Sequence, residues 1–373
     1  MIIGIPREKA ADENRVGLPP AAALGLVRQG HEVLVERNAG AGGGFPDEEF
    51  TAAGARIVHS RDEVYGRAGL IVKVLAPTAE EWECLQPGQA LAALLHLAAQ
   101  PARLLKTLCE RGCTAVDWAV VADERGGLPV LRPMSQIAGR ILPQLAARWL
   151  QSDHGGRGVL LGGLPAVPPA EVLILGGGVL GRNAARAFLG SGARVTLLDA
   201  DYETLRELDW RFGGRLTTYM ASDSALNKTL RYADVVVGAV LIPGARTPHL
   251  VTRDMLELLR DRAVVFDVAI DQGGCFETSR PTRLSDPVYV VDGITHFCVP
   301  NLPSLVARTA THALGNVALP LVAALAAEPV ADALRRNREL ACGTAVFRGR
   351  VVHARVAAAH GVPHEPLDEL LDR

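Results

Sequence analysis

The sequence is poor in aromatic residues and has almost no excess charge. Phe, Trp and Tyr make up 5% of its 373 residues, and 39 basic against 41 acidic side chains leave a formal net charge of −2. Without a basic excess there is no electrostatic attraction to nucleic acid or to an anionic membrane surface, so neither is an expected partner. A hydrophobic content of 49% with 21% charged residues indicates instead a globular enzyme with large buried cores.

Paired cysteine motifs and long apolar runs are also missing. The six cysteines form neither a CxxC pair nor a paired Cys/His spacing, which favours reduced thiols, no metal site and a cytoplasmic location. The first residues read as an apolar strand without a basic region or a cleavage site, so no secretory signal is predicted. The apolar run 316–327 contains Pro320 and is too short to span a bilayer.

The most informative segment of the chain runs from Glu171 to Asp199. Gly176, Gly178 and Gly181 form G-x-G-x-x-G directly after an apolar strand, and a helix and a second strand follow. In a dinucleotide-binding turn the first glycine permits the tight turn, the second lets a pyrophosphate approach the backbone, and the third lets helix pack on strand. The segment therefore predicts a nucleotide-binding βαβ unit.

Two further features of this segment specify the nucleotide. The helix start at Val179 and Leu180 would present free N–H groups to phosphates. Asp199 follows Gly176 by about twenty residues, the spacing at which a carboxylate binds ribose hydroxyls and repels a 2′-phosphate. A glycine turn that served only close packing would explain the glycines but not this acidic strand end. We therefore expect NAD rather than NADP.

The order of apolar segments predicts an α/β fold made of two Rossmann-like domains, in which a doubly wound NAD-binding domain is inserted in a discontinuous substrate domain. We expect residues 1–128 to form the first part of the substrate domain, 129–305 the NAD-binding domain, and 306–373 the returning helices. The ligand would then lie in the cleft between the domains, at the carboxyl ends of the strands. Strands are predicted at 1–5, 31–36, 69–74, 89–97, 114–118, 234–240, 263–270 and 288–291.

Several motifs outside the glycine turn resemble bacterial alanine dehydrogenase, within a superfamily that includes transhydrogenase domain I. The likeness runs almost end to end. DQGGCFE within 267–277 and SRPT at 279–282 are more specific than a Rossmann fingerprint. The other motifs are ENRVGLP at 13–19, LLHLA at 94–98, PMSQIAGR at 133–140, GAVLIPG at 238–244 and the segment 296–303. This resemblance implies NAD-linked oxidative deamination of a small L-amino acid to a 2-oxo acid and ammonia, by a homo-oligomer that is usually a hexamer, with a dimer as the alternative.

The resemblance also implies roles for individual residues. Arg15 would anchor the substrate carboxylate, since an arginine fork bonds both oxygens. His96 would exchange protons, and Asp271 would hold the water that attacks the imino carbon. Asp267, within the predicted buried strand that Asp271 follows, is expected to be structural. Residues at positions that contact the cofactor in the family are Ser135, Val240, Asn301 and Leu302, where Leu302 replaces a usual methionine.

Four positions depart from the family pattern. Leu75 stands where a second lysine usually bonds the substrate, and Ala76 stands where an acidic residue is common. Trp118 and Ala119 replace a Tyr-Glu pair near the substrate. Lys73 is retained and would share a face with residue 75, so it could substitute for the missing lysine if the strand shifts. Trp118 either lines the site or packs in the core.

These departures leave the substrate open at the level of sequence. A less charged pocket suits an amino acid with a larger or less polar side chain than that of alanine. One alternative is an NAD-linked reductase of a related imine or 2-oxo acid in a specialised pathway. A second is an NAD-binding homologue without catalysis, which the joint presence of Arg15, His96 and Asp271 opposes.

Overall fold

The computed structural model describes residues 1–242 and 246–372, which fall into two compact units. The described residues of unit 1 are 1–134 and 303–372, and those of unit 2 are 135–242 and 246–302. Both are built on largely parallel sheets with flanking helices, which confirms the predicted α/β fold with two domains. Pro243 and Gly244, the end of the GAVLIPG motif, lie outside the described residues.

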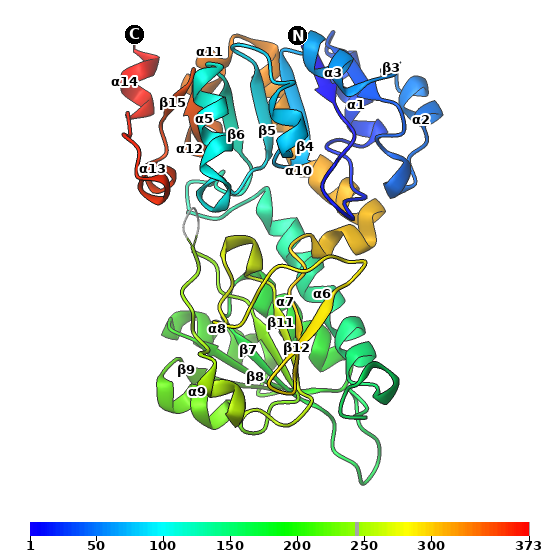
Figure 1. Ribbon diagram of the computed structural model, residues 1–373, viewed down its shortest axis with the longest axis vertical. Coiled ribbons are helices and arrows are strands. Elements are labelled where there is room, and N and C mark those ends of the chain that lie inside the picture. Colours follow the sequence, from blue (N-terminus) through cyan, green and yellow to red (C-terminus); the bar gives the residue numbers. More distant parts are fainter. Residues whose placement is uncertain (243–245, 373) are drawn as a thin grey trace. The chain divides into compact units, whose positions relative to one another are not determined.

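Unit 1 contains an eight-stranded sheet in the order β15-β14-β6-β5-β4-β1-β2-β3 (Figure 1). The first six strands in the chain are parallel, and β14 adds antiparallel to β6. The strands are β1 (Ile2–Ile5), β2 (Glu32–Glu36), β3 (Arg56–Val58), β4 (Leu70–Leu75), β5 (Ala90–Leu94), β6 (Thr114–Asp117), β14 (Thr344–Phe347) and β15 (Arg350–Val351).

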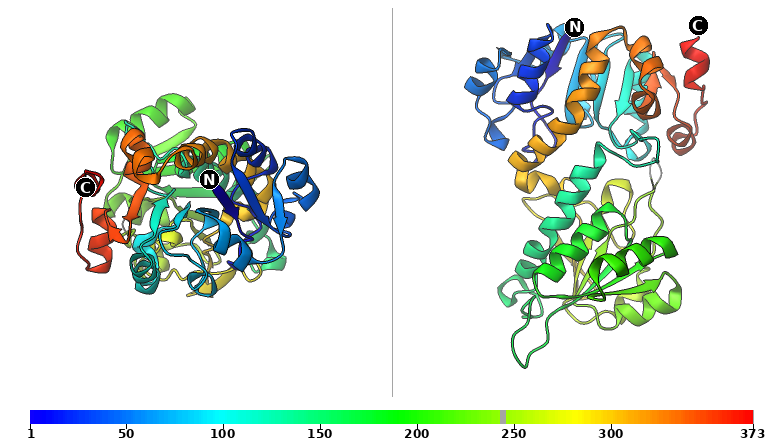
Figure 2. Two further views of the ribbon diagram at one scale, coloured as in Figure 1. Left: turned by 90° about the horizontal axis from the view of Figure 1, so that it is seen from above. Right: turned by 180° about the vertical axis from the view of Figure 1, so that it is seen from behind.

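Helices cover both faces of this sheet. Figure 1 shows α3 and α5 in front of the strands, and the view from behind in Figure 2 shows α10 across the opposite face. The helices of unit 1 are α1 (Pro20–Arg28), α2 (Asp47–Ala52), α3 (Arg61–Arg67), α4 (Ala79–Trp82), α5 (Ala102–Glu110), α10 (Ala307–Ala327), α11 (Val330–Arg336), α12 (Arg338–Gly343), α13 (Ala354–His360) and α14 (Leu367–Leu371). Strands with two covered faces are mostly apolar, as the fully buried run of β5 is, and the buried polar residues of β6 lie at its two ends.

Unit 2 is a doubly wound sheet in the order β12-β13-β11-β10-β7-β8-β9. On β7, Val172 and Ile174 pack with α6, α7 and α8, whereas Leu173 and Leu175 pack with α9 on the other face. The elements are α6 (Leu131–Trp149), β7 (Glu171–Leu175), α7 (Val179–Gly190), β8 (Arg194–Asp199), α8 (Tyr202–Phe212), β9 (Leu216–Met220), α9 (Asp223–Leu230), β10 (Val235–Gly238), β11 (Val264–Asp267), β12 (Val288–Val291) and β13 (Ile294–Phe297).

Two sequence predictions about strands need correction, and some strands were not predicted. The strand predicted at 89–97 ends at Leu94, because the backbone turns at His96 into the short 3-10 helix η2 (Leu97–Ala99). The strand predicted at 263–270 ends at Asp267, and a 3-10 helix, η5 (Ile270–Gln272), follows. Strands β3, β9, β13, β14 and β15 were not predicted, since they are short or carry polar residues that weaken the apolar pattern.

The segment 302–327 is long and apolar enough to cross a membrane by length and composition, with a mean hydropathy of 1.5 and half of the window buried. It also meets the description of a core helix. Within it, α10 buries one side that includes Leu314, Leu321 and Leu325 and packs against α1. Gly315 permits this packing, because a Cβ there would overlap the ring of Pro19, 2.7 Å from its Cγ.

The contact between Gly315 and Pro19 gives a test of this packing. We expect Gly315→Ala to lower the free energy of unfolding by about 1–3 kcal/mol, because a proline ring cannot move aside as a flexible side chain can. Gly66→Ala in α3 is the control: no atom lies within 4 Å of the added Cβ, and the change should stabilise the helix by about 0.5–1 kcal/mol. Urea denaturation measures both. Equal effects would mean that α1 and α10 do not pack as described.

Candidate active site

The glycine turn of unit 2 connects β7 to α7, and the three glycines of the motif differ in what surrounds them. Gly176 has a φ of 103° and would place a Cβ 2.8 Å from Ala239 O. A Cβ at Gly181 would overlap the carbonyl oxygen of Gly176, so only glycine lets α7 pack on the strand. A Cβ at Gly178 meets no protein atom within 4 Å. The space beside Gly178 is therefore open for a ligand that approaches the backbone.

Asp199 ends β8 and is held against this turn. Its Oδ2 accepts a 2.6 Å hydrogen bond from Gly177 N, and its Oδ1 accepts one of 2.8 Å from Asp201 N. Helix α7 begins at Val179 without a side-chain cap and without an acidic residue in its first turn, and Leu180 is half-buried beside it. Uncapped N–H groups, an open Gly178 and an acidic strand end together fit a dinucleotide.

The other residues expected to contact the cofactor lie on separate elements of unit 2. Ser135 is half-buried on α6, and Val240 is half-buried two residues after β10 ends. Asn301 and Leu302 are 6% and 2% exposed and follow β13. Val240 Cγ2 would lie 3.3 Å from a Cβ at Gly176, so Val240 borders the glycine turn. Val240, Asn301 and Leu302 come after carboxyl ends of parallel strands.

The two aspartates after β11 have different environments. Asp267 is 1% exposed and accepts hydrogen bonds from the backbone N–H groups of Cys275 at 2.9 Å, Ala269 at 3.2 Å and Phe276 at 3.3 Å. Burial raises the pKa of Asp267, and these donors oppose that rise. Asp271 is exposed in η5. Asp271 is therefore accessible to solvent, whereas Asp267 is buried and its hydrogen bonds hold the loop that follows β11.

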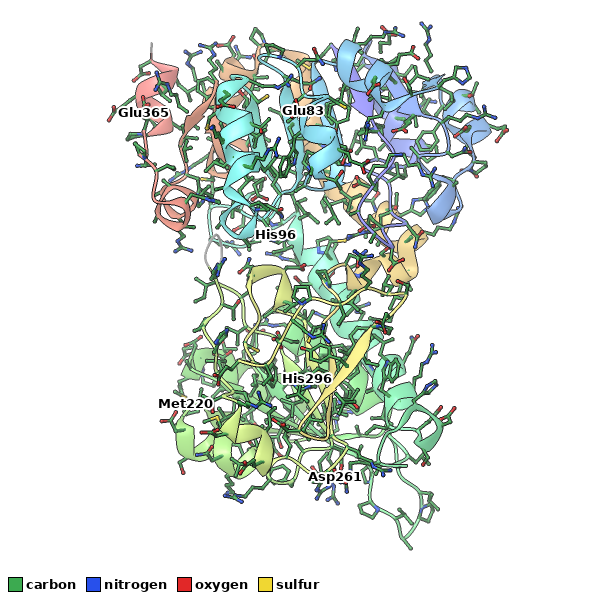
Figure 3. The ribbon with its side chains drawn as sticks, viewed as in Figure 1. Glu83, His96, Met220, Asp261, His296 and Glu365 are labelled. Carbon is green, nitrogen blue, oxygen red and sulfur yellow. The ribbon has the colours of Figure 1, made fainter. Side chains whose placement is uncertain are left out.

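His96 lies just beyond the carboxyl end of β5, at the edge of unit 1 (Figure 3). Its backbone is left-handed, with φ 47° and ψ 43°, which is a costly conformation for a residue with a side chain. The side chain is half-buried, and in the described part of the chain Nδ1 has no hydrogen-bond partner. An imidazole nitrogen that no described protein group occupies is available to a bound ligand.

Arg15 follows β1, the second neighbour of β5 in the sheet, and is 3% exposed. Glu13 occupies one edge of its guanidinium: Nε donates to Oε1 at 2.7 Å and Nη2 to Oε2 at 2.6 Å. Nη1 lies 3.3 Å from Met134 Sδ. Because the fork is bound bidentately within the protein, its position is set before any ligand arrives.

Lys73 lies in a buried cluster of charged side chains. Its ammonium is completely buried and lies 2.9 Å from Glu81 Oε1 and 3.0 Å from Glu8 Oε2. Burial alone lowers the pKa of Lys73, but the charges of Glu8 and Glu81 raise it more, so the lysine stays protonated. The register of β4 on β5 also shifts between Val72 and Leu75, which breaks the alternation on which a shared face depended. These contacts give Lys73 a structural role.

The positions that depart from the family pattern cluster at strand ends. Leu75, at the end of β4, pairs with Leu94 of β5, and both Leu75 and Ala76 are half-buried. Trp118 N donates a 2.7 Å hydrogen bond to Ala93 O, which continues the ladder of β6. Trp118 is completely buried, so it packs in the core, yet in the described chain its indole Nε1 has no acceptor. Ala119 is 2% exposed beside it.

Sequence reasoning missed the acidic partners in unit 1. Glu13 and Glu8 are five residues apart on the loop after β1, and Asp117 is the last residue of β6. Asp117 is 1% exposed and accepts backbone hydrogen bonds on both sides of His96. The signal in the sequence is an acidic residue at the end of an apolar strand, the same pattern that Asp199 shows. No group of three or more possible metal ligands was found among the described residues.

Family models and curated relatives match almost the whole chain. The model of the alanine dehydrogenase/PNT N-terminal domain matches residues 4–138, and that of the C-terminal domain matches residues 143–354. The alanine dehydrogenase of Halomonas elongata is 46% identical over 364 residues, covering 98% of both chains. That of Methanococcus maripaludis is 43% identical over 373 residues and covers 100% of both.

Two solved structures have the same fold. A structure of L-alanine dehydrogenase superimposes with a TM-score of 0.89 at 42% identity, covering 97% of this chain and 99% of the other. A transhydrogenase from Sinorhizobium meliloti shares the fold, with a TM-score of 0.77 at 24% identity over 95% of this chain and 99% of the other.

The buried charge cluster around Lys73 predicts a pH-dependent loss of stability. We expect Lys73→Met to lower the free energy of unfolding by about 3–5 kcal/mol at neutral or higher pH, because two buried carboxylates lose their cation. Burial raises the pKa of Glu8 above its ordinary value of 4.5, and without Lys73 the rise is larger. A group with a raised folded pKa stabilises the fold most at low pH and less as pH rises. The deficit should therefore shrink from about pH 8 to about pH 5.

Lys106→Met is the matched control for this measurement. Lys106 makes an exposed pair with Glu110 at 3.6 Å, so its loss should change stability by less than about 0.5 kcal/mol at either pH. Urea denaturation of both variants at the two pH values gives the comparison. A deficit of Lys73→Met that does not depend on pH would contradict the charged cluster.

Proposed function

The chain belongs to the alanine dehydrogenase/PNT family, and we propose that it is an NAD-dependent dehydrogenase that converts L-alanine to pyruvate and ammonium. The observation that carries this function is the likeness to alanine dehydrogenases at 42–46% identity over 97–100% of the chain. The glycine turn and Asp199 of unit 2 support it independently, because they fit the cofactor that the reaction needs.

NAD accepts the hydride from the substrate Cα when it is bound. The residues proposed to hold it are those of the glycine turn, where Gly178 leaves room for the pyrophosphate and the N–H groups at Val179 and Leu180 are uncapped. Asp199 would accept hydrogen bonds from the ribose hydroxyls. Ser135, Val240, Asn301 and Leu302 are proposed to complete this site.

Arg15 is proposed to bind the carboxylate of alanine. Its guanidinium is buried and held by Glu13, so the side chain of Arg15 would lose little conformational entropy when the substrate binds. Glu13 also balances the positive charge, which prevents a net cation from being buried when no substrate is present. The half-buried Leu75 would border the substrate as an apolar side chain.

His96 and Asp271 are proposed to handle protons and water. Oxidation at Cα yields an imine, to which water must add before ammonia leaves. Asp271, exposed and close to two glycines, would orient that water, and His96 would take a proton from the amine and return one to the leaving nitrogen. Asp267 supports this arrangement through the loop that carries Asp271.

We assign residues 1–128 to substrate binding, 129–305 to NAD binding and 306–373 to completion of the substrate domain. The division into compact units near residues 134 and 302 supports this assignment. A cytoplasmic homo-oligomer, a hexamer by family resemblance, is part of the same proposal. The imine or 2-oxo acid reductase and the non-catalytic homologue are not favoured, because the full-length relatives described above are alanine dehydrogenases.

The test is formation of NADH by the purified protein with NAD and L-alanine, with NADP and D-alanine as comparisons. We expect turnover with the first pair only. Gly178→Ala should weaken NAD binding by about tenfold or more without loss of stability, because its methyl group occupies the open space beside the turn. Gly190→Ala, at the far end of α7, also meets no atom within 4 Å and should leave NAD binding unchanged. Absence of turnover on alanine despite NAD binding would overturn the proposal.

Leu75 gives a second test of the substrate site. If the pocket is otherwise complete for alanine, Leu75→Lys should raise kcat/KM for alanine by at least about tenfold, because a cation would polarise the reacting centre. Leu75→Met has a similar volume without a charge and serves as the control. An unchanged kcat/KM in Leu75→Lys would mean that the pocket no longer depends on a lysine at this position.

A further inference from the structure

Asp117 is a buried carboxylate for which the reaction described above has no direct use. It ends β6, pairs in register with Ala93 of β5, and is 1% exposed. A charged carboxylate in such a place needs several hydrogen-bond donors to offset its desolvation. The donors that it uses are therefore informative.

Those donors are backbone N–H groups around His96. Leu95 N donates to Oδ1 at 2.9 Å and Leu97 N donates to Oδ2 at 3.3 Å, so the two residues that flank His96 are tied to one carboxylate. Ala119 N donates to Oδ1 at 3.0 Å, which links the same group to the residue after Trp118. Asp117 thus joins the exits of two neighbouring strands.

This arrangement explains why the backbone turns at His96. In an extended strand the N–H groups of residues i and i+2 are about 6.6 Å apart, so hydrogen bonds from both to the two oxygens of one carboxylate would be strongly bent. They converge only when the residue between them leaves the extended conformation, as His96 does with φ 47° and ψ 43°. The carboxylate therefore favours the left-handed turn over continuation of β5.

A second contact fixes the same turn from the other side. His360, at the end of α13, has Nε2 2.7 Å from Leu97 O, and α13 packs on η2. Leu97 is thus held at its N–H by Asp117 and at its carbonyl by His360. The left-handed conformation costs about 1–2 kcal/mol, so it persists because such contacts hold it.

We propose that Asp117 is a positioning residue, which sets the imidazole of His96 for proton transfer by holding the turn between Leu95 and Leu97. This inference rests on the proposed function, in which His96 exchanges protons with the substrate. Asp117 does not touch the substrate in this role. It acts only through His96, which gives it a signature that a purely structural residue lacks.

The signature is that substitution of Asp117 no longer lowers kcat when His96 is absent. Asp117→Ala should lower kcat for alanine by about 100-fold with a smaller change in KM, because displacement of a catalytic group by about 1 Å has that effect. Asp117→Asn keeps one oxygen for Leu95 N but sets an amide N–H₂ against Leu97 N, so its loss should be smaller, about tenfold. In a His96→Ala background, Asp117→Ala should change kcat by less than about threefold.

Gln89→Ala is the matched control. Gln89 lies at the opposite end of β5, is 3% exposed, and its Nε2 donates to Tyr65 O at 2.8 Å and Ala68 O at 2.7 Å. Its loss removes buried side-chain to backbone hydrogen bonds without touching the turn. We expect lower stability but a kcat within about twofold of the unmodified protein.

The outcomes separate this inference from the function on which it rests. If the unmodified protein does not oxidise alanine, the proposed function fails, and the rate of diethylpyrocarbonate modification at His96 then tests the positioning, since Asp117→Asn should change it and Gln89→Ala should not. If alanine is oxidised and Asp117→Ala lowers kcat equally with and without His96, the positioning role is wrong. Should Asp117→Ala fail to fold, Asp117→Asn in the same two backgrounds decides the question.

Discussion

Backbone N–H groups at the ends of parallel strands must find acceptors, and three aspartates meet this need in the same way. Asp117, Asp199 and Asp267 are each the last residue of a strand, β6, β8 and β11. Each accepts hydrogen bonds from the loop that follows its own strand, and Asp117 and Asp199 also bind the loop after the neighbouring strand. These loops carry His96, the glycine turn and Asp271. Within each unit, the loops that carry the proposed site residues are therefore held by carboxylates at strand ends.

A second constraint concerns the balance of buried charge in unit 1. Arg15 and Lys73 are cations that water does not solvate, and each is neutralised by acidic residues on or near the β1 exit loop. Tyr65 extends the lysine cluster by donating to Glu81 at 3.2 Å, and burial with the charges of Glu81 and Glu8 raises the pKa of this tyrosine well above its ordinary value. In the proposed site, the substrate carboxylate would share a guanidinium whose position Glu13 already fixes.

Sequence patterns predicted the fold and the cofactor turn because both depend on local constraints. Continuous apolar runs of parallel strands, G-x-G-x-x-G and an acidic strand end can be recognised within about thirty residues. Prediction was weaker where a distant segment completes an element. Strand β14 joins β6 across more than two hundred residues of sequence. The end of β5 depends on Asp117 of the neighbouring strand, so the sequence pattern predicted a strand that continued past His96.

The sequence by itself determined the α/β class, the discontinuous first domain, the dinucleotide turn and the residue types available for amino-acid oxidation. The fold class and the turn follow from periodicity and from short-range backbone geometry, whereas the residues for amino-acid oxidation follow from the resemblance to the family. Only the tertiary structure decided which buried polar groups pair with each other. Lys73 pairs with Glu8 and Glu81, one edge of Arg15 with Glu13, and the amides around His96 with Asp117. The physical reason is that burial makes pairing obligatory, while the choice of partner depends on which distant segments the sheet brings to one edge.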